Sequence, residues 1–176
     1  MKSITTSFAA LIFLAAPAYS QSITEKTGVN SALGITPTTQ DFVTEVANSD
    51  MLEIQSSHLV ATKSDDKDKA FAEHMIKDHT ATSDKMKELV NSGKVKANLP
   101  STMDSAHQSK LDKLKGLNGK EFSKQYEDMQ VSVHKDAVSL FQRYGKSGDN
   151  ADLKAFASQT LPTLQEHLKM AQDLAK

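Results

Sequence analysis

The amino-acid sequence predicts an all-α protein folded as an antiparallel four-helix bundle. Four long segments each repeat apolar residues at helical spacing, so one face of every segment is apolar. Residues that cap helices stand where these segments begin. The sequence holds no run rich in β-branched residues that would indicate a strand, and no internal repeat. Four amphipathic helices bury their apolar faces most simply against one another.

The first two helices are delimited by capping residues. Thr38 and Asp41 form a pair similar to a capping box, which predicts that the first helix runs from Thr38 to about Lys63. Ser64–Asp66 then caps the second helix, because its acids lie at the positive end of the helix dipole. We expect the second helix to continue to about Asn91.

Three further helices follow. A short extra helix is predicted over residues 103–116, between the second and third long helices. Asn118 is expected to cap the third long helix, which ends at Gly145–Gly148, and Asn150 to cap the fourth, which runs to the C-terminus. Pro162 lies inside this last helix and removes one backbone hydrogen bond, so we expect a bend there.

One polar side chain interrupts the apolar face near the middle of each long helix. These side chains are Glu53, His79, His134 and His167. Each lies within about four residues of its helix's midpoint, a spread of roughly 6 Å along the axis. Because the midpoints of antiparallel helices of similar length meet at one level, the four side chains can converge. A buried polar group costs free energy unless it is paired, so the pattern predicts a binding site in the core.

Three imidazoles and a carboxylate suit a transition metal such as Zn²⁺, Fe²⁺ or Cu²⁺. We expect Asp50, Glu127 and Gln130 to support the ligands, because they lie on or beside the same faces. Three protonated histidines would repel one another in an apolar core, so we expect all three folded-state pKa values to be depressed. His58 and His74 are expected to be solvated or peripheral. A hydrogen-bonded polar layer without any ligand is the alternative.

Residues 1–20 have the pattern of a secretory signal peptide. Lys2 precedes the apolar run 8–16, which is too short to span a bilayer, and small residues then precede a cleavage site. We expect cleavage after Ser20, with Ala18 as the second choice. The pattern predicts a periplasmic or secreted protein whose mature form has no membrane span.

Behind this signal we expect a flexible segment over residues 21–36 and one bundle domain over residues 37–176. The absence of cysteine excludes disulfides, thiolate metal sites and cysteine nucleophiles. Lys and Arg total 21, and Asp and Glu total 22. The sequence therefore has no excess of positive charge that would indicate nucleic-acid binding. The sequence does not point to a particular protein partner.

Three motifs resemble those of an exported bacterial family. They are residues 71–80 (FAEHMIKDHT), residues 126–134 (YEDMQVSVH) and residues 161–168 (LPTLQEHL). Together with Glu53 they are similar to the family grouped as the domain of unknown function 4142, over residues 40–176. The resemblance implies a ferritin-like four-helix bundle that is exported and has no established activity.

The resemblance also implies which residues form the site. The family's acid and histidines fall on Glu53, His79, His134 and His167, the residues that helical register selects, and its other acid on the second helix falls on Asp78 as a supporting residue. Ferritin-like di-iron proteins carry Glu-x-x-His pairs. Here the residue three positions before each histidine is apolar. A mononuclear or structural site is therefore favoured over a bridged di-iron centre.

These features favour an exported helical bundle that binds a metal ion or small ligand, with a role in envelope metal handling or stress protection. The rival interpretation is a non-catalytic envelope protein whose polar layer only sets helix register and whose exposed faces contact partners. A third is an enzyme, in which a metal with one open coordination position activates water. The bend expected at Pro162 is the sequence feature that would give access to such a site.

Overall fold

The computed structural model describes Ser31, residues 33–64 and residues 66–176. These residues form five α-helices and no strand, so the all-α prediction is confirmed. The helices are α3 (Thr39–Lys63), α4 (Asp66–Asn91), α5 (Ser105–Lys115), α6 (Gly119–Ser147) and α7 (Ala151–Leu174). The predicted signal peptide and the predicted flexible segment up to residue 30 lie outside the described residues. No described helix has the length and apolar character that a membrane span requires.

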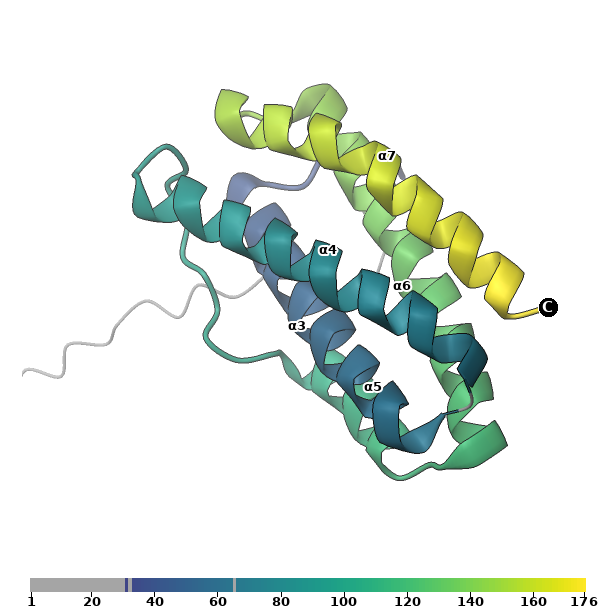
Figure 1. Ribbon diagram of the computed structural model, residues 1–176. Helices are drawn as coiled ribbons and strands as arrows, with labels where there is room; N and C mark the ends of the chain where they lie inside the picture. Colours follow the sequence, from purple (N-terminus) through teal and green to yellow (C-terminus); the bar gives the residue numbers. More distant parts are fainter. Residues whose placement is uncertain (1–30, 32, 65) are drawn as a thin grey trace, which may run out of the picture.

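The four long helices form two hairpins that pack side by side (Figure 1). α3 pairs with α4, α6 pairs with α7, and the hairpins meet through α3 against α6 and α4 against α7. A long crossover leads from the end of α4 back along the bundle to the start of α6, and α5 within it packs on α3 and α6. One such crossover is the connection that ferritin-like bundles use.

Thr38 and Asn150 cap their helices as predicted, and Asp104 caps α5, for which no cap was predicted. The side chains of Thr38, Asp104 and Asn150 each accept a backbone N–H from the first turn of the following helix. Asn118 occupies the N-cap position of α6 but makes no side-chain cap hydrogen bond. Its Oδ1 instead accepts a hydrogen bond of 3.0 Å from Lys63 Nζ, which ties the end of α3 to the start of α6.

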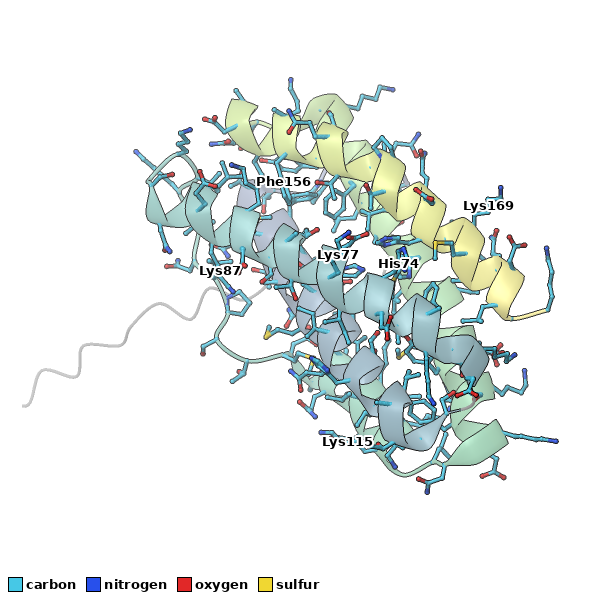
Figure 2. All side chains as sticks on the ribbon, viewed as in Figure 1. His74, Lys77, Lys87, Lys115, Phe156 and Lys169 are labelled. Carbon is cyan, nitrogen blue, oxygen red and sulfur yellow. The ribbon has the colours of Figure 1, made fainter. Side chains whose placement is uncertain are left out.

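The core consists of two apolar clusters at opposite ends of the bundle. The Phe42 cluster joins the starts of α3 and α7 to the ends of α4 and α6, and Figure 2 shows Phe156 within it between α7 and α4. The Phe122 cluster joins the other halves of the same helices to α5. His79, His134 and His167 each fall between the two clusters along their helix, and Glu53 follows Leu52 of the Phe122 cluster, so a layer of histidines separates the two apolar clusters.

α7 remains one helix through Pro162, which is exposed. Proline has no N–H to donate to the carbonyl of Ser158, one turn earlier. Figure 1 shows that the axis of α7 changes direction along its length. α7 therefore changes direction within one continuous helix, and its half after Pro162 brings His167 to His79 of α4 and His134 of α6.

Candidate metal centre

Three of the four predicted site residues meet in the bundle core. His79 of α4, His134 of α6 and His167 of α7 each offer one ligand atom, and these atoms lie within 4.8 Å of one another. Their ring centroids are 5.5–5.6 Å apart. None of the three residues is more than 3% exposed. The three histidines thus converge at one level, as predicted from helical register.

Each imidazole donates an N–H to an oxygen outside the cluster. His79 Nδ1 donates to Asp50 Oδ1 at 2.8 Å, His134 Nδ1 to the carbonyl of Gln130 at 2.9 Å, and His167 Nε2 to Asp78 Oδ2 at 3.1 Å. These oxygens fix which nitrogen carries the proton and how each ring is turned. The same arrangement orients the histidine ligands of metal centres and increases their basicity.

The other nitrogen of each ring has no hydrogen-bond partner among the described residues, although it is buried. These atoms are His79 Nε2, His134 Nε2 and His167 Nδ1. A buried polar atom without a partner costs about 1–3 kcal/mol. Three such atoms in one cluster fit a metal ion, because neutral imidazole nitrogens bind Zn²⁺, Fe²⁺ and Cu²⁺ through their lone pairs.

Glu53 lies beside the histidines but is not part of the group that meets within 4.8 Å. It is 1% exposed on α3, and its Oε2 accepts a hydrogen bond of 2.7 Å from Gln130 Nε2. Its Oε1 is buried and has no hydrogen-bond partner in the described part of the chain. The contacts of Glu53 therefore place it next to the centre, and its role as a ligand remains a prediction.

The predicted supporting residues have different positions. Asp50 and Asp78 each accept a hydrogen bond from a histidine of the cluster. Gln130 contacts the centre twice, through its carbonyl and through its side chain. Glu127 is 8% exposed and forms an ion pair of 2.6 Å with Lys67 near the start of α4. Its described contact therefore joins two helices and does not orient a histidine.

Burial and neighbouring charges give the three histidines different pKa values. Burial, followed by the charge of His79, lowers the pKa of His134 to about 3. The same two causes lower the pKa of His167. Burial also acts to lower the pKa of His79, but the hydrogen bond and charge of Asp50 outweigh it and raise that pKa above its usual value. The expectation of three depressed values is wrong for His79, because a buried carboxylate stabilises its cation.

Burial raises the pKa of both acids at the centre. It is the largest influence on Asp50 and on Glu53, and the positive charge of His79 opposes it in both. A cation bound by the histidines would act on these carboxylates as the His79 imidazolium does and favour their charged forms. The two acids therefore make the centre better suited to a metal cation than three histidines alone.

A pocket of about 360 Å³ lies beside this centre. His79 and Asp50 are among its lining residues, whereas His134 and His167 are not, and exposed residues of α5 and α6 line it as well. Pro162 is not among its lining residues, so the pocket opens beside α5 and not at the bend expected to give access. Periodicity could not reveal it, because the pocket depends on how the crossover places α5. His58 and His74 are exposed, as predicted.

The sequence was also compared with known families and proteins. The sequence model of the family described as Domain of unknown function (DUF4142) matches residues 24–174. The chain belongs to this family. No curated protein and no solved structure matches the chain significantly. Membership of the DUF4142 family assigns no activity, so the function of this member has to be argued from the histidine centre.

Proposed function

We propose that this DUF4142 protein is an exported helical bundle that binds a transition metal through His79, His134 and His167, with Glu53 as an adjacent carboxylate. One observation carries the proposal. Each ring donates its outer N–H to a fixed acceptor, and the remaining buried nitrogen has no hydrogen-bond partner in the described residues. This is how proteins present histidine ligands to a metal.

The donor atoms narrow the choice of metal. Imidazole nitrogens with a nearby carboxylate favour Zn²⁺, Fe²⁺ or Cu²⁺ over Mg²⁺ and Ca²⁺, which prefer oxygen ligands. Bound at this centre, such an ion would supply Lewis acidity, and Fe or Cu would also supply redox chemistry. With the signal-peptide pattern of residues 1–20, the centre supports a role in envelope metal handling or stress protection.

The rival interpretation, a polar layer that only sets helix register, is less well supported. Such a layer stabilises a fold when its polar groups satisfy one another. Here the rings hydrogen-bond outward, to Asp50, to Asp78 and to the Gln130 carbonyl. Their inner nitrogens would remain a cost to the fold if nothing bound them.

Metal analysis of the purified mature protein, prepared without an affinity tag, tests the proposal. After incubation with Zn²⁺, Fe²⁺ and Cu²⁺ in turn and removal of free ion, the protein should retain about one equivalent of at least one metal. His167→Ala should lose it, whereas His74→Ala, which alters an exposed histidine of α4, should retain it. Retention of less than roughly a tenth of an equivalent by the wild type would exclude the proposed centre.

Export is tested separately from metal binding. We propose that the protein is released into the periplasm or medium after cleavage behind Ser20. Expression of the full chain in a Gram-negative host, followed by mass measurement of the exported product, should give a protein that begins at Gln21. A product that stays in the cytoplasm with its first twenty residues attached would contradict the proposed location.

A further inference from the structure

His107 of α5 has both ring nitrogens against carboxylates. Its Nδ1 lies 2.9 Å from Asp104 Oδ1, and its Nε2 lies 3.4 Å from Glu45 Oε1 on α3. The residue is 7% exposed. An ionised carboxylate only accepts hydrogen bonds, and a neutral imidazole carries a proton on one nitrogen alone. Both contacts are therefore favourable only while His107 is the imidazolium cation.

Charged groups of α3, α5 and α6 surround this ring. Burial lowers the pKa of His107, but the hydrogen bonds and charges of Glu45 and Asp104 outweigh it and raise that pKa above its usual value. On α6, Asp136 lies close enough for the charges of Lys110 and His107 to act on it. The other charged or titratable residues that line the same pocket are Asp50, His79 and Arg143. Three acids and one lysine thus lie nearest the ring among the described residues, and these surroundings favour its cation.

The two ends of α5 are held to the bundle in different ways. At its start, beside the ion pair with α3, the Asp104 N–H donates a hydrogen bond of 2.9 Å to Asn48 Oδ1. Its later part is held through Leu111 and Leu114, which belong to the Phe122 cluster. Apolar packing does not depend on protonation, so a change of pH acts on the start of α5 and leaves its end in place.

We propose that His107 is a pH-sensitive latch: its cation holds the start of α5 against Glu45 of α3, and loss of one proton releases this contact and widens the pocket. Four residues at or near the start of α5 line that pocket, namely Asp104, Ala106, His107 and Lys110. A neutral ring keeps its proton on Nδ1, where the contact with Asp104 is shorter, and loses the longer contact with Glu45. The latch needs no metal and is independent of the proposed function.

The latch should be closed in acid and should open as the pH rises. Because the folded-state pKa of His107 is raised, the contribution of its contacts is fully present below the unfolded-state value of about 6.5. It is lost as the pH rises through the folded-state value. NMR of the ring nitrogens should therefore show His107 still largely doubly protonated at a pH of about 6.5 to 7.

The reactivity of an introduced cysteine tests the opening, because the chain has no cysteine of its own. Leu140 is 4% exposed and lines the pocket from α6. In Leu140→Cys, an uncharged thiol reagent should react slowly while the latch is closed. The rate is divided by that for Ser132→Cys, an exposed position of α6 that is not among the lining residues. This ratio should rise about tenfold between about pH 6 and 9, the effect expected for loss of a charge-assisted hydrogen bond.

Substitutions of the two latch residues, made in the Leu140→Cys protein, decide between the latch and a general loosening. Glu45→Gln presents an amide that can accept from the imidazolium and donate to the neutral ring, so the contact survives in both protonation states. Its reactivity ratio should stay low up to about pH 9. His107→Ala should give a high ratio already at about pH 6, because the contact is absent. His58→Ala, which alters an exposed histidine of α3, is the control and should keep the original pH profile.

Two results would overturn the latch. If Glu45→Gln keeps the same rise of reactivity with pH, the contact between α5 and α3 has no part in the opening. If His107 is already neutral below about pH 6, the ring is not held as a cation by its two carboxylates. Either result would leave the proposed metal binding unaffected.

Discussion

A hydrogen bond of 2.8 Å inside the bundle joins His79 Nδ1 of α4 to Asp50 Oδ1 of α3. Both residues are 3% exposed. The carboxylate holds the proton on Nδ1, which leaves Nε2 as the nitrogen available to a metal. It also raises the pKa of His79 while His134 and His167 have lowered values. One carboxylate thus makes His79 chemically different from its two neighbours.

Asp50→Asn should weaken metal binding without removing a ligand. The amide can still orient the ring but no longer supplies negative charge, and loss of such a partner typically lowers metal affinity by about 10–100-fold. Competition with a chromophoric chelator would measure the change. Asp136→Asn is the control, because Asp136 lines the same pocket but makes no described hydrogen bond to a histidine. Equal losses in both variants would show that only net charge matters.

The stability of the apo protein should fall in acid, and His134 should be a major cause. Its folded-state pKa is lowered to about 3, whereas the unfolded value is about 6.5. Between these values the unfolded chain binds a proton that the folded chain does not, so the free energy of unfolding decreases as the pH falls from about 6.5 to 3. The full loss of unfolding free energy from this group is on the order of 5 kcal/mol.

Urea unfolding at a series of pH values would measure this contribution. His134→Gln should flatten the acid side of the stability curve, whereas His74→Gln should leave it unchanged because His74 is exposed. The raised pKa of His79 acts in the opposite sense: its contribution is present below about pH 6.5 and is lost as the pH rises through its folded value. A curve for His134→Gln parallel to that of the wild type would contradict the buried neutral state of His134.

Metal binding should release a proton. The raised pKa of His79 keeps both of its nitrogens protonated in part of the population near neutral pH, and a metal at Nε2 must displace one proton there. Calorimetric titration in two buffers of different ionisation enthalpy should give a release of up to about one proton per metal. The release should diminish in Asp50→Asn. Identical heats in the two buffers would show that His79 is neutral before the metal arrives.

Pro162→Ala should raise stability and lower metal affinity together. Alanine restores an N–H that can bond the carbonyl of Ser158, and a proline inside a helix costs about 3 kcal/mol. A straighter α7 would also move His167 relative to His79 and His134. Thermal unfolding with and without metal would measure both effects. A stabilised variant with unchanged metal affinity would show that the bend has no part in positioning His167.

Much of this fold and of its centre follows from the sequence because helices are regular. Thr38 caps the first long helix as predicted, and residues 79, 134 and 167 meet because 1.5 Å of rise and 100° of turn per residue fix height and direction. The predicted convergence of the three histidines therefore agrees with the structure, because it depends on position along each single helix.

The sequence does not reveal which side chains of different helices contact one another, or how those contacts shift pKa values. The hydrogen bond between Glu53 and Gln130 and the raised pKa of His79 both arise from contacts between neighbouring helices. The path of the crossover is equally hidden, because no periodicity shows that α5 will lie on α3 and α6 and bound a pocket. Asn118 shows the same limit, since its cap position was predictable and its bond to Lys63 was not.

The separation of the core into the Phe42 and Phe122 clusters bears on how the protein tolerates change during evolution. Substitutions that share no neighbours usually have additive effects on stability, whereas those in contact are coupled. One end of the bundle can therefore accumulate or compensate substitutions without altering the packing of the other. The three histidines lie between the two clusters. Their relative positions are therefore kept only while the packing at both ends holds the helices in register.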